Sequence, residues 1–205
     1  MRRILAVGAH PDDVEIGCGG TLLRHLGNGD EVHALVLTCG EGGNSPARVR
    51  RREAETAAEV AGYTSVRFGD LHALEMCYVR QAYAEVIERA VADIVPDVVY
   101  CHNHEDLHQN HVTAAGVSLI ASKRVREVYS FRLPSTTTNF RPRLYVDVTE
   151  QMTDKLKVVG AFESQAGKDY MQGWWIKGVG VAHAIEARLP EGRYAEAFIV
   201  ERIVR

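Results

Sequence analysis

The sequence predicts an α/β fold, a three-layer Rossmann-like architecture with a mostly parallel central sheet. Strand-like runs, helix-like segments and the length of the chain point to it. Short apolar runs typical of strands buried on both faces alternate along the first half with longer segments typical of helices. The third observation is size, because 205 residues without a linker-like shift in composition are expected to form one domain, residues 1–205.

The first half of the chain supplies the regular part of this pattern. Arg3–Ala9 is a continuous apolar run that ends at a proline, as expected for a central parallel strand. Pro46–Gly62 is rich in Ala, Glu and Arg and closes with a glycine, which predicts a helix. The other elements expected here are strands at Glu31–Thr38, Val66–Phe68 and Asp97–Cys101 and a helix at Tyr78–Val95.

The second half is less regular. Strands are expected at Glu127–Leu133, Arg143–Val148 and Glu196–Val204, a helix at Glu150–Phe162, and a polar loop at Pro134–Pro142. The segment Gln172–Arg188 receives no assignment, because its early glycines oppose a helix whereas its end is helical in pattern.

Composition excludes several classes of protein. With 46% hydrophobic and 25% charged residues, the chain is neither disordered nor fibrous, and a net charge of −3 disfavours a nucleic-acid partner. No apolar run reaches the length of a membrane span, and the early His10 and Pro11 interrupt any signal peptide, so we expect a cytoplasmic protein. The four cysteines are expected to be buried thiols rather than disulfides: Cys18, Cys39, Cys77 and Cys101.

Histidines and carboxylates gather directly after two predicted strands. His10-Pro11-Asp12-Asp13 follows the first strand, and the run from His102 to His111 follows the strand at Asp97–Cys101. Ligands of open parallel sheets bind at these strand ends. Two imidazoles with one carboxylate suit zinc with an open coordination position, or a ferrous ion. The alternative is that Asp12 or Asp13 only caps the following helix.

These two motifs resemble those of the LmbE-like or PIG-L-type zinc-dependent N-acetylglucosamine deacetylases. The first is similar over Ala9–Glu15 with the glycines that follow, and the second over Asp106–His111. Weaker similarities run along most of the chain, at Gly40-Glu41, Arg50, Glu53, Gly62, 146–149, Lys155, Ser164-Gln165 and 194–198.

The resemblance implies a set of site residues. It places one zinc ion per chain, or another divalent ion such as Fe²⁺, on His10, Asp13 and His111. It makes Asp12 the general base, and it gives His108, as a cation, the task of stabilising the oxyanion or protonating the leaving amine.

Substrate contacts are expected from residues beside this centre. The resemblance places Arg50 at the site, although the run of Arg48, Arg51 and Arg52 around it also fits a solvated helix face. The small polar loop that contains Glu41 and Asn44 lies at a strand end, so both are candidates for substrate binding.

Several residues carry open questions. Many family members have an aspartate where this chain has Asn110, and we expect Asp106 or Glu105 to replace its charge near His108. His102 and His104 are either supporting donors, substrate contacts or ordinary polar residues. Trp174 and Trp175 fit a sugar-stacking wall, the core or a subunit contact.

The leading functional hypothesis is a zinc-dependent hydrolase that removes acetate from an N-acetylated amino sugar of the GlcNAc type, or from a glycosylated small metabolite, and leaves a free amine. Alternatives are the same chemistry on a thiol conjugate or an antibiotic intermediate, and a metal-binding module without catalysis. A Rossmann oxidoreductase is disfavoured, because Gly17-Cys18-Gly19-Gly20 does not fit the dinucleotide-binding spacing. The resemblance also implies a homo-oligomer such as a trimer or hexamer.

Overall fold

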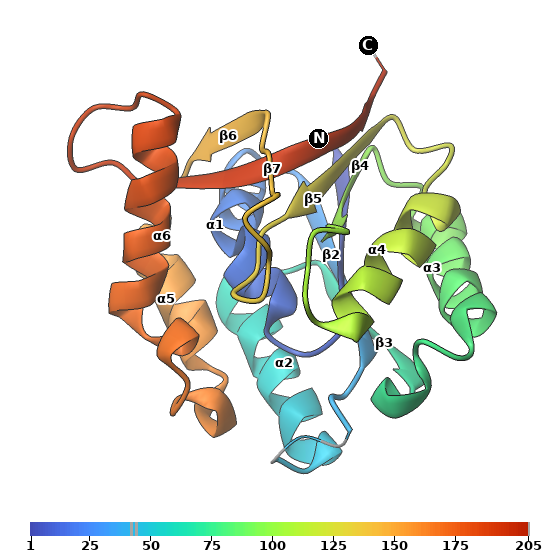
Figure 1. Cartoon of the computed structure of the whole chain (residues 1–205). Coiled ribbons are helices and arrows are strands. Elements are labelled where there is room, and N and C mark those ends of the chain that lie inside the picture. The colour runs from blue at the N-terminus through green and yellow to red at the C-terminus, as the bar shows by residue number, and fades with distance from the viewer. Residues whose placement is uncertain (42, 44, 205) are drawn as a thin grey trace.

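The computed structural model describes residues 1–41, 43 and 45–204. Its centre is one seven-stranded sheet with helices on both faces (Figure 1). The strands are β1 (Arg3–Gly8), β2 (Glu31–Thr38), β3 (Ser65–Leu71), β4 (Val98–His102), β5 (Glu127–Phe131), β6 (Leu144–Asp147) and β7 (Ala195–Ile203). The helices are α1 (Asp13–Gly27), α2 (Ala47–Ala61), α3 (Arg80–Ile94), α4 (Gln109–Ala121), α5 (Met152–Gly160) and α6 (Gly173–Glu186), with short 3₁₀ turns η1 (Ala73–Glu75), η2 (Glu163–Gln165) and η3 (Asp169–Met171).

The sheet has the order β3-β2-β1-β4-β5-β7-β6. The first five strands in the chain pair in parallel, whereas β7 and β6 add to β5 as antiparallel strands. This confirms the predicted α/β fold with a mostly parallel sheet, and it puts β1 next to β4 at the centre.

Burial on both faces explains the continuous apolar run of β1. Leu5 and Val7 pack into the core beneath α3 and α4, whereas Ile4 and Ala6 face the core beneath α1. A strand covered on both faces has no solvent side, so its sequence lacks the alternation of an edge strand.

The segment that the sequence left unassigned is α6, which is helical from Gly173 onward. Its glycines are tolerated because one of them fits a close contact: a Cβ at Gly180 would lie 3.2 Å from both Met152 and Tyr194. Tertiary packing here outweighs the helix stability that is lost because glycine has a low helix propensity.

A buried ion pair joins α5, β7 and α1. Lys155 Nζ lies 2.6 Å from Glu196 Oε1, and Glu196 also accepts the backbone N–H groups of Gly20 and Thr21. Because both charges are satisfied, their burial is tolerated, and the pair fixes the middle of α1 against α5 and β7.

All four cysteines are free thiols. Cys18, Cys39 and Cys101 are buried, as expected, and Cys77 is partly exposed.

Candidate metal centre

The candidate site lies where two neighbouring strands end. β1 and β4 pair directly and in parallel, with Ile4 opposite Val98. The segments that follow them therefore meet at the carboxyl ends of the strands. His10 to Asp13 leave β1 and begin α1, while His102 ends β4 and His108 precedes α4. The topology therefore brings together residues about 100 positions apart in the chain.

The three predicted metal ligands lie together. Asp13 Oδ2 is 3.4 Å from His10 Nδ1, and Asp13 Oδ1 is 3.5 Å from His111 Nε2. Two overlapping groups, His10 with His108 and His111, and Asp13 with His102 and His111, each present ligand atoms within 4.8 Å of one another. Ligand atoms of a tetrahedral zinc ion, each about 2.1 Å from the metal, are about 3.4 Å apart, so spacing and donor chemistry both fit.

Electrostatics keep this centre ionised. Burial would raise the pKa of Asp13, but the adjacent His111 and His102 hold it well below its usual range. Burial would likewise lower the pKa of His111, but Asp13 and Asp106 together raise it to about 10. The carboxylates thus create a strong preference for positive charge at the position between the imidazoles.

Asp106 orients His111. Its Oδ1 lies 3.2 Å from His111 Nδ1 and accepts a 2.6 Å hydrogen bond from Ser135. This leaves Nε2 of His111 turned toward Asp13, which is the arrangement of a carboxylate that supports a metal-binding histidine. Asp106 accepts the backbone N–H of His108 and does not bond its ring; its charge raises the pKa of His108 but is outweighed by burial and by His111 and His10, so the expectation that it replaces the missing aspartate stays a prediction.

Asp12 is held beside the cluster in a strained conformation. Its φ of 96° lies in the left-handed region, which non-glycine residues adopt rarely, and its side chain is buried. Arg50 from α2 donates to the carbonyl oxygen of Pro11 and lies 3.2 Å from Asp12 Oδ2. Burial, together with Asp13, raises the pKa of Asp12 to about 6, although Arg50 opposes the shift.

The surroundings of His108 favour the neutral form of its ring. Its Nδ1 accepts the backbone N–H of Asn110, which places the ring proton on Nε2. Burial and the nearby His111 and His10 lower the pKa of His108 to about 4. These shifts favour the uncharged ring, which would offer its Nε2–H as a donor, and the predicted role of His108 stays a prediction.

The Asn110 side chain contacts His10, not the His108 ring. Its Nδ2 lies 3.0 Å from His10 Nε2 and 3.0 Å from the carbonyl oxygen of Ala73. Among the described residues, Oδ1 of Asn110 has no hydrogen-bond partner although it is buried.

His102 is a site residue whose place the sequence left open. It is buried, its Nε2 lies 3.2 Å from Asp13 Oδ2, and it accepts the backbone N–H of Ala9. Its position as the last residue of β4, directly after an apolar strand, is the signal that points to it. His104 is exposed and lies near Arg80 and Gly116 instead.

The residues predicted to contact substrate differ in their surroundings. Arg50 lies at the site as described above. Glu41 accepts backbone N–H groups of Cys39 and Ala73 with its two oxygens, so it braces η1 against the end of β2. Asn44 falls outside the described residues. Substrate contact by these three residues stays a prediction.

Trp174 and Trp175 are neighbours on α6 but differ in burial. Trp175 packs in the core, whereas Trp174 is exposed.

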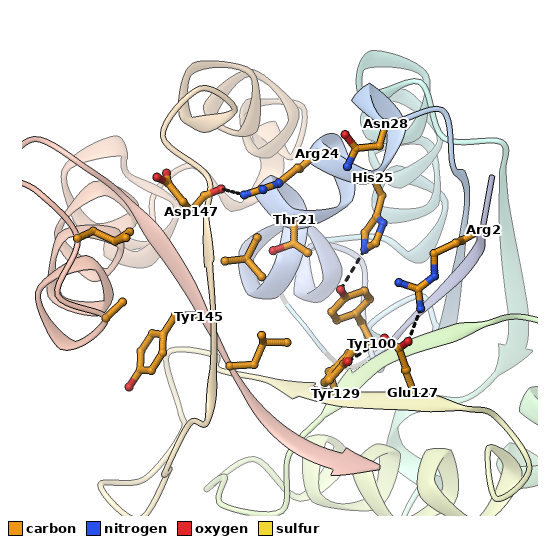
Figure 2. Close-up of a pocket in the computed structure, with 14 residues that line it drawn as sticks. Arg2, Thr21, Arg24, His25, Asn28, Tyr100, Glu127, Tyr129, Tyr145 and Asp147 are labelled. Carbon is orange, nitrogen blue, oxygen red and sulfur yellow. Dashed lines mark hydrogen bonds and ion pairs between the residues drawn. The ribbon is translucent and has the colours of Figure 1, made fainter. Parts of the chain in front are cut away.

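A cavity of about 610 Å³ lies at the opposite end of the sheet, near the amino ends of the parallel strands (Figure 2). Its charged groups are already paired: Arg2 binds Glu127 at 2.7 Å, and Arg24 donates to the carbonyl oxygen of Asp147. The cavity contains none of the predicted site residues. Within residues 1–41, 43 and 45–204, no helix has the length and apolar character of a membrane span.

Comparisons with known proteins place the chain in a family. The profile of the GlcNAc-PI de-N-acetylase (PIG-L) family matches residues 5–122. The uncharacterized deacetylase YaiS of Escherichia coli is 31% identical over 153 residues, covering 72% of this chain and 83% of that protein. The diacetylchitobiose deacetylase of Thermococcus kodakarensis is 25% identical over 197 residues, covering 85% of this chain and 74% of that protein.

Solved structures share the fold. The conserved protein TT1542 of Thermus thermophilus superposes with a TM-score of 0.84 at 24% identity, covering 100% of this chain and 97% of that one. The 4-carboxy-2-hydroxymuconate hydratase GalB of Pseudomonas putida does so with a TM-score of 0.74 at 21% identity, covering 100% and 99%. At these identities the likeness shows the fold alone. The match over residues 5–122 and the relationship to YaiS show more: the chain belongs to the GlcNAc-PI de-N-acetylase (PIG-L) family, the LmbE-like enzymes that hydrolyse amides.

Proposed function

We propose that this protein is a zinc-dependent N-deacetylase that releases acetate from an N-acetylated amino sugar of the GlcNAc type, or from a glycosylated small metabolite. The observation that carries the proposal is the cluster of ligand atoms around Asp13: His10 Nδ1 lies 3.4 Å from its Oδ2 and His111 Nε2 lies 3.5 Å from its Oδ1, with Asp12 next in the chain. Relatives named for diacetylchitobiose and for an inositol-linked acetamido sugar support the substrate class.

A divalent ion held by His10, Asp13 and His111 would polarise the acetamide carbonyl and make a water molecule more acidic. Asp12 is the base that removes the proton from the attacking water. With a pKa of about 6 it is mostly ionised at neutral pH yet holds a proton well enough to pass it on. Arg50 keeps the Asp12 carboxylate oriented by bridging it to the carbonyl oxygen of Pro11.

His108 stabilises the negative charge that develops on the acetamide oxygen. Because the backbone of Asn110 occupies Nδ1, the Nε2–H of His108 is available as a donor. Such a donor needs no positive charge. The proton that the leaving amine requires then comes from protonated Asp12 instead of His108.

The first experiment measures metal per chain in the purified protein and in three variants. We expect about one zinc per chain in the parent and in Asp12→Asn, and little in His111→Ala. His104→Ala serves as the matched control, because this exposed histidine of the same segment lies outside the cluster. No bound metal in the zinc-supplied parent would refute the site.

The second experiment supplies the zinc-loaded protein with N-acetylglucosamine, diacetylchitobiose and an N-acylated thiol conjugate, and measures acetate and free amine. We expect hydrolysis of an acetamido sugar, and a loss of about 10²–10⁴-fold in kcat for Asp12→Asn with its metal retained. The thiol conjugate tests the alternative substrate. A GalB-like hydratase of this fold would release no amine from any of them.

A further inference from the structure

The segment between α5 and α6, which contains η2 and η3, lies near the candidate site. Figure 1 shows this segment at the same end of the molecule as the starts of α1 and α2. It belongs to the part of the chain beyond residue 122, where the match to the family profile ends. The side chains that it brings to the site are therefore not part of the motifs after β1 and β4.

Glu53 of α2 ties this segment to Asp12. One carboxylate oxygen of Glu53 accepts the backbone N–H of Ser164 at 2.6 Å, and the other accepts the hydroxyl of Ser164 at 2.7 Å. The same carboxylate lies 3.8 Å from Arg50, whose guanidinium lies 3.2 Å from Asp12. Two hydrogen bonds to one carboxylate fix the position of a short turn. The segment is therefore held in place relative to Asp12.

Lys168 and Tyr170 extend from this segment as a pair. Lys168 Nζ lies 5.4 Å from the centroid of the Tyr170 ring, which is the distance of a cation–π contact, and Tyr170 packs against the core cluster beneath α1. Burial raises the pKa of Tyr170, and the contact with Lys168 opposes this rise. The carboxylates of Asp12 and Asp13 add to the rise. The tyrosine thus lies within electrostatic reach of both carboxylates of the site.

Lys168 also acts on Asp12 directly. Burial raises the pKa of Asp12, whereas Arg50 and, more weakly, Lys168 lower it. The two cations differ in their surroundings. Arg50 is buried between the carboxylates of Asp12 and Glu53, so its charge is already used by the protein.

The ammonium group of Lys168 has no acidic partner in the part of the chain that the structure describes. No carboxylate of those residues lies within 4.0 Å of it, and the side chain is exposed. A lysine ammonium is a compact charge with three donors, and its strongest hydrogen bonds are those to anionic oxygens. Lys168 is therefore a positive charge beside the site that is available to a ligand.

We infer that Lys168 is a specificity-determining residue that binds an anionic group of the acetamido substrate, either a carboxylate or a phosphate. This inference rests on the proposed function, since it places the acetamide at the metal centre next to Asp12. The Tyr170 ring holds the ammonium group on that side of the site. The substrate class then narrows to acetamido sugars that carry a negative charge close to the acetamide-bearing ring.

The first test compares hydrolysis of neutral N-acetylglucosamine with that of N-acetylglucosamine 1-phosphate and N-acetylmuramic acid, which carry a phosphate and a carboxylate. In the zinc-loaded parent we expect a higher kcat/KM for a charged probe than for the neutral one. Lys168→Gln is expected to lower the ratio of charged to neutral kcat/KM about 10–100-fold. Any effect of Lys168 on Asp12 acts on both substrates and cancels in this ratio. The charged probe whose ratio falls identifies the anion.

Two further variants accompany Lys168→Gln. Lys168→Arg keeps the charge and is expected to retain most of the preference for the anionic probe. Lys157→Gln is the matched control, because Lys157 is an exposed lysine of α5 that pairs with Asp154, and its removal is expected to leave the ratio unchanged. Circular dichroism confirms that each variant is folded.

Salt separates charge recognition from a structural role of Lys168. The screening length falls from about 10 Å at 0.1 M salt to about 3 Å at 1 M. KM of the parent for the charged probe is therefore expected to rise with salt, while its KM for N-acetylglucosamine changes little. In Lys168→Gln the salt dependence of KM for the charged probe should be weaker.

Binding without turnover distinguishes failure of this inference from failure of the proposed function. Calorimetry with glucosamine 1-phosphate needs no hydrolysis, and we expect it to bind the zinc-loaded parent about tenfold or more tightly than Lys168→Gln. This difference in a protein that hydrolyses no acetamide would contradict the deacetylase but support the anion site. Equal binding by parent and Lys168→Gln, or an unchanged ratio of kcat/KM in a protein that does hydrolyse acetamides, would overturn the inference.

Discussion

Gly17→Ala is expected to destabilise the protein and to disturb the metal centre together. Gly17 lies on the inner face of α1, and a Cβ there would be 2.4 Å from Cδ2 and 2.7 Å from Cγ of Phe131. Phe131 is completely buried, and its ring centroid lies 5.0 Å from that of His102. Neither the ring nor the helix can move without displacing a neighbour of Asp13.

The magnitude follows from two opposing terms. Alanine in place of glycine stabilises a helix by about 1 kcal/mol, whereas an overpacked core contact costs about 1–3 kcal/mol. Because 2.4 Å is far inside normal carbon contact distance, we expect the upper part of that range, with a net loss of about 1–2 kcal/mol. For a chain of this length the thermal midpoint falls by roughly 2–8 °C.

Gly19→Ala is the matched control. It lies two residues further along the same helix, and a Cβ there would be 3.8 Å from Lys155 and 3.9 Å from Glu15, which is ordinary contact. We therefore expect Gly19→Ala to be neutral or up to about 1 kcal/mol more stable. Urea unfolding and zinc content of both variants provide the measurements. Equal stability of the two variants, or full metal binding with an unshifted affinity in Gly17→Ala, would refute the reasoning.

Three further outcomes follow from the structure. Lys155→Met leaves the buried Glu196 without its cation and is expected to cost about 3–5 kcal/mol by urea unfolding, whereas Lys157→Met on the surface costs about 0.5 kcal/mol or less. Burial lowers the pKa of His25 below 6.5, so the unfolded chain binds more protons than the folded chain. The free energy of unfolding is therefore expected to fall as the pH falls below about 6.5. In His25→Gln the urea midpoint should change less between about pH 7.5 and 5.5. Asp106→Asn is expected to weaken zinc binding about 10–100-fold in a competition titration, and an unchanged affinity would contradict its orienting role.

The parallel core of the fold could be predicted because its strands leave an unambiguous pattern. β1 and β2 are apolar without alternation, and the predicted range Glu31–Thr38 coincides with the observed β2. The start of α6 could not be predicted, since Gly173 and Gly178 weaken a helix that its contacts with β7, η3, α5 and β6 stabilise. Local propensity and tertiary packing point in different directions there.

The candidate site, like the fold, could be predicted only in part from the sequence. His10, Asp13 and His111 stand in two short motifs after adjacent strands, so the sequence could bring them together. The partner of Asp106 could not be predicted. The backbone turn before α4 directs its carboxylate to the ring of His111 and to the backbone N–H of His108, not to the His108 ring. Motifs identify the groups present, whereas their hydrogen-bond partners depend on side-chain directions set by the fold.

Arg50 shows why one arginine among neighbours acquires a role. Arg51 points outward to Asp70, and Arg50, one position earlier on α2, points inward to Pro11 and Asp12. The helix places consecutive side chains about 100° apart, so only one of them can reach the end of β1. A planar guanidinium can bind a carbonyl oxygen and a carboxylate at once, which holds Asp12 in a conformation that its own backbone disfavours. The strained Asp12 and the buried Arg50 therefore depend on one another, although they come from two segments that no local pattern connects.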